Sequence, residues 1–397
     1  MEGVESGDQR RTIEQVKELA NIAGVHNTKG PVQMLRYSSE WMKDEYKLLE
    51  LNKELLVNIK EGDEIVIRGN KDDDTVLCSK NKTYELRAAD TSNTLLLVPD
   101  VSAEEDGEEE CLDRPVLSCF STYYEVRLIQ PRLERLKEIL ERNAFANTQD
   151  EERKEKYTTQ QLLGLIQASE DEMNHGLKRL GALQIDGCWR VLDIDYQEKA
   201  FSQILALVEE KCWDWHAIPI QFTCDILEEL YPSFVLEYCL KTYGNLVEGD
   251  NLSDDVEMAG DLYCLDENKV CRYYAEYILR PALGKFNYYE FMEAWEQSVP
   301  EGMKINKDCL AGIALTDLKT HPPVIWHFAE RSLPENPADR FNVLFKTRQK
   351  WNEKDIVPYL ENLLAPGQKL SSLFLKYARS STDANGAKVY NSKTPLS

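Results

Sequence analysis

The chain has 397 residues, a formal net charge of −23 and a hydrophobic content of 42%, which allows packed cores in an acidic protein. A length of this size predicts about two to four domains. No apolar run approaches the roughly 18 to 20 residues of a membrane-spanning helix, and the N-terminal MEGVESGDQRRTIEQ lacks the order of a signal peptide. We therefore expect a soluble intracellular protein without membrane contacts.

The ten cysteines are scattered along the chain and form no Cys-x-x-Cys pair. A zinc site would show two close pairs, and a disulfide framework is unfavourable in a reducing compartment. We interpret the cysteines as small buried hydrophobic side chains and predict no metal ligands.

The N-terminal third is predicted to be rich in strands. Residues 1–40 are a polar lead-in, either disordered or carrying one amphipathic helix over Thr12–Ala23. In 41–130, short apolar segments such as DEIVIRG, TVLC, KTYELRA and TLLLV alternate with the turn clusters GNKDDD and SKNK. Short strands at this spacing predict a small antiparallel barrel or sandwich. The acidic run 101–113 predicts a solvated loop or, as the alternative, an acidic docking segment.

From Pro131 onward the pattern becomes helical, and one type of helix start occurs three times. Its sequences are Lys156-Tyr157-Thr158, Lys285-Phe286-Asn287 and Lys350-Trp351-Asn352. In each, Thr or Asn can cap a helix by accepting hydrogen bonds from its free amides. Three residues after each cap, Gln161 and Glu290 can complete a capping box, and Asp355 favours the helix dipole.

The segments after each start also follow one order. In the first copy, a second helix opens at Ser169 with Glu172 as its box partner, and QIDGCWRVLD predicts strand, Asp-Gly turn, strand. The middle copy has FNYYEFMEAWEQSV, KINKDCLAGI and then ALTDLKTHPPVIWHFAE. The last copy has WNEKDIVPYLENLL, the helix QKLSSLFLKYARSS and a hairpin at Asn385-Gly386. Two helices followed by a two-stranded wing indicate winged-helix domains.

We therefore predict an α+β protein in which a β-barrel-like domain precedes an array of three winged helices. The predicted domains are 131–215, then 216–334 with a helical extension and an acidic loop at 247–261, and then a basic domain at 335–397. The alternative is one irregular helical domain with ordinary caps.

Positive charge is concentrated in the last of these domains. From Pro337 to Ser397 there are ten Lys or Arg and five Asp or Glu, so this segment is +5 and the remainder is −28. In the helix read at 368–381, four side chains lie within about a quarter-turn of one another: Lys369, Ser372, Lys376 and Arg379. Lys388 and Lys393 on the wing and tail are candidates for a second contact. Such a face suits DNA phosphates without sequence specificity, and a solvated basic face is the alternative.

Signatures of catalysis are missing from the chain. Gly244 and Gly249 have P-loop spacing, but Asp250 and Asn251 follow them where Lys and Ser or Thr are required. No Gly-x-Gly-x-x-Gly, His-Glu-x-x-His or Gly-x-Ser-x-Gly occurs, and the five histidines are far apart. We predict no catalytic, cofactor-binding or metal-binding residues, and expect that the chain is not an enzyme.

Four segments resemble one known family. VIRGNKDDDTVLCSKNKTYELRAADTSNTLLLVP (66–99), KYTTQQLLGLIQASEDEM, FNYYEFMEAWEQSVPEGM and KVYNSKTPLS are similar to the Dcc family, "defective in sister chromatid cohesion". The resemblance runs in order from about residue 40 to the end. It implies a nuclear, non-ATPase subunit of an alternative clamp loader resembling replication factor C.

The same resemblance implies the partners. They are a small cohesion subunit, the C-terminal tail of a large ATPase subunit, the catalytic subunit of DNA polymerase epsilon, DNA, and the PCNA clamp through the complex. Because strand edges invite pairing, we expect apolar strand residues to serve either subunit assembly or the domain's own core: Ile65, Ile67, Tyr84, Leu86, Leu95 and Leu97. The alternative functions are a winged-helix scaffold without DNA binding and a sequence-specific DNA-binding regulator.

Overall fold

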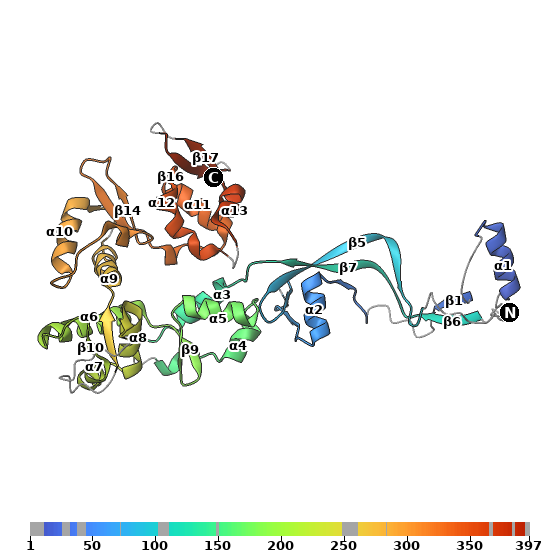
Figure 1. Ribbon diagram of the computed structural model, residues 1–397, viewed down its shortest axis with the longest axis horizontal. Helices are drawn as coiled ribbons and strands as arrows, with labels where there is room; N and C mark the ends of the chain where they lie inside the picture. Colours follow the sequence, from blue (N-terminus) through green and yellow to red (C-terminus); the bar gives the residue numbers. More distant parts are fainter. Residues whose placement is uncertain are drawn as a thin grey trace. The chain divides into compact units, whose positions relative to one another are not determined.

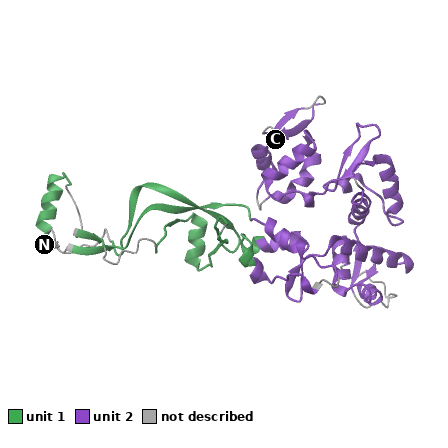
Figure 2. Ribbon diagram, turned by 180° about the vertical axis from the view of Figure 1, so that it is seen from behind, with its two compact units in different colours: residues 1–131, 163–172 green, residues 132–162, 173–397 purple. Residues whose placement is uncertain are grey.

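The computed structural model describes residues 12–25, 32–37, 45–71, 73–101, 111–147, 151–247, 261–282, 284–364, 368–382 and 386–393. The chain divides into two compact units, coloured green and purple in Figure 2. Unit 1 comprises 1–131 and 163–172, and unit 2 comprises 132–162 and 173–397. The predicted α+β class is confirmed, because helices and small sheets occur along the whole described chain.

Unit 1 is built around a five-stranded sheet with the order β2-β7-β5-β4-β3. Its strands are β2 (Leu49–Glu50), β3 (Val66–Arg68), β4 (Val76–Cys78), β5 (Thr83–Leu97) and β7 (Ser118–Leu128). The neighbours β3, β4, β5 and β7 pair antiparallel, and β2 runs parallel to β7. The two longest strands, β5 and β7, form an extended curved ribbon that is visible in Figure 1. Their register shifts between Asp90 and Leu95.

Helix α2 (Lys53–Glu61) supplies the core residue beneath this sheet. The side chain of Asn52 accepts from the amide of Leu55 at its start, and Gly62 ends it at a φ of 87°. Leu55 packs with Leu77 and Tyr84 in a small buried cluster. The cluster is therefore assembled from one helix and two strands.

Two further elements of unit 1 lie outside the five-stranded sheet. Strands β1 (Val32–Tyr37) and β6 (Cys111–Val116) pair parallel with each other. Helix α1 (Ile13–Ile22) opens with a capping box between Thr12 and Gln15, which confirms the helix predicted at Thr12–Ala23. None of the residues of α1 is buried.

In the described part of residues 134–392, one order of elements occurs four times, and its first copy includes the segment 163–172 of unit 1. The order is helix, short extended segment, helix, second helix or 3₁₀ turn, and two strands. We name these repeats 1 (134–190), 2 (194–265), 3 (267–327) and 4 (337–392). In repeats 2 to 4 the first strand pairs with the last, which also pairs with the middle one. In repeat 1 an isolated bridge between Tyr157 and Trp189 replaces the first pairing.

The helices and strands of the four repeats have the following bounds. Repeat 1 contains α3 (Glu134–Arg142), α4 (Thr159–Leu165), α5 (Glu170–Arg179), β8 (Leu183–Ile185) and β9 (Cys188–Arg190), with the 3₁₀ turn Glu151–Arg153 before α4. Repeat 2 contains α6 (Ile194–Glu210), β10 (Ile218–Pro219), α7 (Ile220–Leu227), α8 (Ser233–Tyr243), β11 (Gly244–Leu246) and β12 (Leu262–Leu265). Repeat 3 contains α9 (Glu267–Leu279), β13 (Phe286–Asn287), α10 (Tyr288–Ser298), η2 (Lys307–Leu310), β14 (Ala314–Asp317) and β15 (Val324–His327). After η3 (Glu330–Ser332), repeat 4 contains α11 (Pro337–Thr347), β16 (Trp351–Asn352), α12 (Glu353–Ile356), η4 (Val357–Tyr359), η5 (Glu361–Leu363), α13 (Leu370–Tyr377), β17 (Ala378–Thr382) and β18 (Lys388–Ser392).

Several local predictions are confirmed. Thr158 and Gln161 exchange hydrogen bonds at the start of α4, as a capping box requires. Asn287 accepts from two amides of α10. Asp186 and Gly187 have φ values of 51° and 76°, so the predicted Asp-Gly turn joins β8 to β9.

Repeat 2 was not found from the sequence as a separate copy, because its helix start has no polar cap. Pro219 occupies the N-cap position of α7 and offers no side-chain acceptor. A pattern based on Thr or Asn at a helix start therefore does not include this repeat, whose residues fall in the predicted domains 131–215 and 216–334.

Three predicted helices differ from the structure. WNEKDIVPYLENLL is broken into α12, η4 and η5 because Pro358 lacks an amide donor and clashes with the preceding turn, and Asn352 makes no side-chain cap. KINKDCLAGI forms only the 3₁₀ turn η2. The helix predicted over 368–381 ends at Tyr377, because Ala378–Thr382 pairs with β18 as a strand.

Most buried side chains of unit 2 belong to two clusters. One runs through repeats 2 and 3 and includes Phe201, Leu236 and Trp295. The other fills repeat 4 around Phe341, Leu344 and Trp351 and takes in Leu315 of repeat 3. Adjacent repeats therefore share core side chains.

Some predicted features lie outside the described residues. These are residues 1–11, 26–31 and 38–40 of the lead-in, residues 102–110 and 248–260 of the two acidic loops, and Asn385 of the last hairpin. Within the described residues, no helix combines the length and the apolar character needed to cross a lipid bilayer.

Candidate partner-binding and nucleic-acid surfaces

The six residues predicted for subunit assembly occupy different environments in unit 1. Tyr84 is buried in the small core cluster, and burial raises the pKa of its phenol. Ile65 and Leu86 are partly buried against that cluster. Leu97 is half-buried, whereas Leu95 and Ile67 are exposed. Tyr84 therefore belongs to the domain's own core, whereas the exposed Ile67 and Leu95 remain candidates for subunit assembly.

Ile67 is the most exposed of the six, with 64% of its surface accessible. It lies on β3, which is the last strand in the order of the sheet. An edge strand offers backbone donors and acceptors to another chain. Leu128 on β7 is similarly exposed at 62%.

The outer face of α2 adds apolar residues that the sequence analysis did not single out. Leu56, Val57 and Ile59 are exposed, while Leu55 faces the core. The signal was present in the sequence, because a nine-residue helix with four large aliphatic residues has more apolar surface than one buried stripe requires. Unit 1 therefore presents apolar surface on both a strand edge and a helix.

A second group in unit 1 explains how the segment 163–172 is held. The carboxylate of Glu172 accepts from the Ser169 hydroxyl at 2.7 Å and from the Thr83 hydroxyl at 2.6 Å. The Ser169 amide donates to Thr83 Oγ1 at 2.8 Å. The Ser169 amide also donates to the Glu172 carboxylate, and the Glu172 amide donates to the Ser169 hydroxyl. The predicted capping box is therefore confirmed, and Glu172 is engaged inside unit 1 rather than offered to a partner.

The predicted DNA-binding residues all have exposed side chains, and all except Lys393 lie within repeat 4. Lys376 lies in the last turn of α13, whereas Lys369 is its N-cap residue and Arg379 lies on β17. Placing Lys369 and Arg379 on one continuous helix was therefore wrong. Lys388 lies on β18, which pairs with β17, and Lys393 follows it.

Apolar residues of α13 pack against the core of repeat 4. Leu373 and Phe374 are buried, and Leu370 and Tyr377 pack partly against the same core. Phe374 stacks on Tyr390 of β18 with ring centroids 3.9 Å apart. This contact fixes the helix against the strand pair that carries Arg379 and Lys388.

The basic side chains differ in how freely they can meet phosphate. The Lys393 ammonium donates to the carbonyl oxygen of Leu375 at 3.0 Å and so closes the C-terminal end of α13. The Ser372 hydroxyl donates to the carbonyl oxygen of Lys369 at 2.7 Å. Lys376 lies 5.0 Å from the Tyr377 ring centroid. Because the Tyr390 hydroxyl accepts from Lys388, the pKa of that ammonium is raised and its charge is retained.

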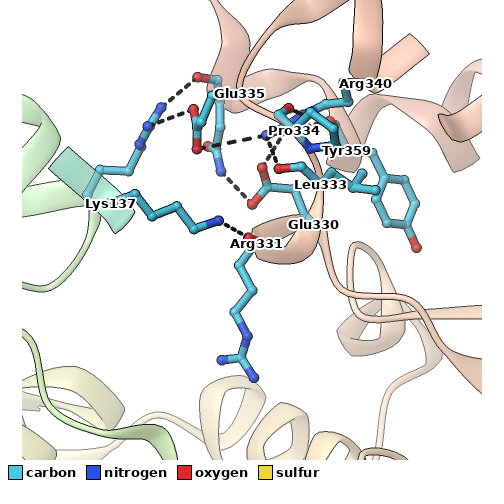
Figure 3. A network of polar contacts seen from close by, with 10 residues as sticks. Lys137, Glu330, Arg331, Leu333, Pro334, Glu335, Arg340 and Tyr359 are labelled. Atoms are coloured by element: carbon cyan, nitrogen blue, oxygen red, sulfur yellow. Dashed lines mark hydrogen bonds and ion pairs between the residues drawn. The ribbon is translucent and has the colours of Figure 1, made fainter. Parts of the chain in front are cut away.

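A network of polar contacts joins repeat 1 to repeat 4 within unit 2 (Figure 3). Arg340 of α11 is fully buried. Its guanidinium donates to the Glu330 carboxylate and to the carbonyl oxygens of Leu333, Pro334 and Tyr359. The sequence contained this signal as a charged residue four positions before the core residue Leu344.

The segment 328–336 between repeats 3 and 4, which we name the connector, contains Glu330, Leu333 and Pro334 and also receives two side chains from repeat 1. Arg179 of α5 pairs with Glu335 at 2.8 Å and donates to the carbonyl oxygen of Asn362 at 3.1 Å. Lys137 of α3 donates to the carbonyl oxygen of Arg331 (Figure 3). Repeats 1 and 4 are therefore fastened to each other although they are far apart in the chain.

No group of three or more His, Cys, Asp or Glu side chains is arranged to hold a metal ion among the described residues. Burial raises the pKa of several thiols, including that of Cys239 to about 12. A raised pKa keeps such a thiol protonated and chemically inert. The interpretation of the cysteines as buried packing residues is therefore right for five of those described, but it is wrong for Cys212, which is exposed, and Cys119, Cys188 and Cys264 are only partly buried.

Comparison with known proteins gives the family. The model of the family described as "Sister chromatid cohesion protein Dcc1" matches residues 46–360. The chain belongs to the Dcc1 family of sister chromatid cohesion proteins. It is 39% identical to sister chromatid cohesion protein DCC1 of Xenopus laevis over 98% of this chain and 100% of the relative.

The similarity to Dcc1 proteins extends across distant eukaryotes. The human protein DCC1 is 39% identical over 89% of this chain and 90% of its own length. The Saccharomyces cerevisiae protein DCC1 is 24% identical over 84% of this chain and 93% of its own length. The resemblance stated from the sequence is therefore confirmed at the level of the family.

Proposed function

We propose that this chain is a non-catalytic, nuclear subunit of an alternative clamp loader that resembles replication factor C. In this proposal it assembles with a small cohesion subunit and with the C-terminal tail of a large ATPase subunit. It links that complex to the catalytic subunit of DNA polymerase epsilon and to DNA, for loading or unloading of PCNA. Membership of the Dcc1 family supports the role in cohesion.

The observation that carries the assembly step is the apolar surface of unit 1. We infer that its sheet is one part of a β-barrel module completed by the two partner subunits. Exposed Ile67 at the strand edge and exposed Leu56 and Val57 on α2 support this, because buried apolar surface drives association. The partner strands would also satisfy the edge of β3.

The repeated order of elements in unit 2 supports an array of winged-helix domains. In this interpretation, α13 is the second helix of the last domain and takes the recognition position. Arg379 and Lys388 on the neighbouring strands add cations beside Lys376. Such a set binds phosphates electrostatically and without reading bases.

Replacing Ile67 by Asp tests the assembly proposal. The exposed side chain contributes little to folding, so the variant is expected to unfold like the native chain while co-purifying at least about tenfold less of the small subunit and the ATPase tail. Leu318→Asp is the matched control, since Leu318 is 58% exposed in repeat 3. Unchanged recovery of both subunits with Ile67→Asp would show that this edge is not the assembly surface.

Replacing Lys376 and Arg379 together by Ala tests the DNA proposal. We expect weaker binding to unrelated duplexes and single strands, and a salt dependence whose slope falls by up to about 2. Lys241→Ala in repeat 2 is the control, because Lys241 is exposed and paired with Glu237. Normal DNA binding by the double variant would move the DNA surface elsewhere, and no binding by the native chain at low salt would favour a protein scaffold.

A further inference from the structure

A cavity of about 390 Å³ lies where repeats 2 and 3 meet in unit 2. Its walls include two tryptophans and a proline, Trp213, Trp215 and Pro300, and Leu205 contributes an aliphatic wall. Its charged lining residues are two carboxylates, Glu209 on α6 and Glu301 after α10. Aromatic and aliphatic walls with two negative charges suit a ligand that has an apolar stem and a cationic end.

The turn that places Trp213 has an unusual backbone. Helix α6 ends in a motif where the amide of Trp213 donates to the carbonyl oxygen of Val208, and Cys212 has a φ of 53°. Glycine is usual at this position because a side chain disfavours a positive φ. Cys212 adopts this positive φ at a cost in conformational energy. The turn places Trp213 beside the last residues of α6 at the cavity.

Trp215 is held from two sides. The His216 ring stacks on its indole with centroids 3.5 Å apart. On another side, the turn from Pro300 to Met303 passes close to the indole, and a Cβ on Gly302 would lie 3.7 Å from its Nε1 atom. Gly302 has a φ of 95°, which allows this tight turn to bring Pro300 and Glu301 to the cavity.

The chain beside Trp213 and Trp215 also carries negative charge at Asp214. The His216 amide donates to the Asp214 carboxylate and holds the pKa of Asp214 below its usual range, so this group stays ionised. The nearest basic residue in the sequence, Lys211, pairs with Glu210 at 2.9 Å. The two lining carboxylates come from separate segments rather than from one fork, which suits a compact ammonium better than a planar guanidinium.

We propose that this cavity binds the ammonium end of a lysine side chain on a partner protein, with the aliphatic stem against Trp213, Trp215 and Pro300. N-methylation of that lysine strengthens binding, because methyl groups add apolar contact without removing the charge. None of the residues that line the cavity is among those assigned to subunit assembly or to DNA. Its test is therefore independent of the proposed function.

Indole N–H signals of the full chain provide the readout in solution. The chain has seven tryptophans, and Trp213→Phe and Trp215→Phe identify the two signals of the cavity. Three probes are titrated: N-acetyl-lysine amide, N-acetyl-trimethyllysine amide and the neutral N-acetyl-norleucine amide. The Trp213 and Trp215 signals are expected to shift most with trimethyllysine, and norleucine is expected to bind at least about fivefold more weakly than it, the ratio for 1 kcal/mol of cation–π attraction.

Charge-neutral variants distinguish a cation-binding site from an apolar surface that does not select for charge. Glu209→Gln combined with Glu301→Gln is expected to lower the affinity for both cationic probes toward that of norleucine. Tyr289→Ala, at an exposed aromatic residue of α10, is expected to change nothing. Unchanged signals of Trp295 and Trp351, whose indoles donate to buried carbonyl oxygens, report that each variant is folded. Norleucine binding as tightly as trimethyllysine, no shift at either cavity signal, or full affinity in the double Gln variant overturns the proposal.

Discussion

Unit 1 and unit 2 differ in how they cover their apolar side chains. The buried cluster under the sheet of unit 1 consists of Leu55, Leu77 and Tyr84. In unit 2, one cluster continues from repeat 2 into repeat 3, and a second one fills repeat 4. Most of the large apolar side chains that are exposed in the described chain nevertheless lie in the shorter unit 1. The difference indicates that unit 2 completes its own cores, whereas unit 1 is expected to complete its core with partner chains.

The largest expected effect comes from deleting a core leucine in each unit. Leu55→Ala and Leu344→Ala both truncate a side chain with no exposed surface, at a cost of about 2–5 kcal/mol. In unit 1, where Leu55 packs with Leu77 and Tyr84, we expect this loss to open the sheet while unit 2 stays folded. In unit 2, neighbouring repeats share the core, so Leu344→Ala is expected to lower stability without local unfolding.

Hydrogen exchange of β4, α2 and α11 measures this difference directly. Leu55→Ala should remove protection from β4 and α2 alone, and adding the small cohesion subunit should restore it, because a partner that binds only the folded state stabilises it. Equal loss of protection in both units would mean that they unfold as one, and the comparison would fail.

The next effect tests how a buried charge holds the connector in unit 2. Arg340→Ala leaves the Glu330 carboxylate and three carbonyl oxygens without this donor, and we expect a loss of about 3–5 kcal/mol. Lys354→Ala is the control, since Lys354 and Asp308 form an exposed ion pair worth about 0–1 kcal/mol. Urea unfolding of both variants gives the two values. A loss of about 1 kcal/mol or less for Arg340→Ala would show that the connector is not fixed by this network.

Sequence patterns predicted elements with local hydrogen bonds better than elements that depend on packing. Local signals with their own hydrogen bonds were read correctly, as at Ser169 with Glu172 and at the turn Asp186-Gly187. The start of α7 was missed because Pro219 lacks a side-chain acceptor, and its helix depends on packing instead. Pro358 broke a predicted helix, although its effect was readable from the residue itself.

The candidate surfaces were predicted less evenly. Lys376 was placed correctly on α13, but Arg379 belongs to a strand, because pairing of β17 with β18 is a long-range property. Which apolar residues of unit 1 are exposed could not be read from alternation, since Tyr84 and Ile67 have similar local patterns and opposite burial. The cavity proposed to bind a lysine side chain is lined by residues of two repeats, so no single segment of the sequence contains its pattern.

The smallest expected effects come from two helix ends that have the same backbone geometry in the two units. Gly62 after α2 and Cys212 after α6 both have positive φ values, 87° and 53°. Gly62→Ala places a Cβ in open space, so it introduces backbone strain of about 1 kcal/mol without a clash. Cys212→Gly relieves strain, and we expect a gain below about 1 kcal/mol because glycine also loses more entropy on folding.

Thermal unfolding of these two variants shows whether unit 1 remains folded after a small loss in its free energy of unfolding. In unit 2, the gain from Cys212→Gly should raise the midpoint slightly and leave a single transition. In unit 1, Gly62→Ala should produce a separate early transition, because a thin core tolerates even about 1 kcal/mol poorly. A Gly62→Ala chain that shows no early transition without partners would mean that the sheet of unit 1 is stable by itself. The apolar edge around Ile67 would then have to be explained without a need for completion by another chain.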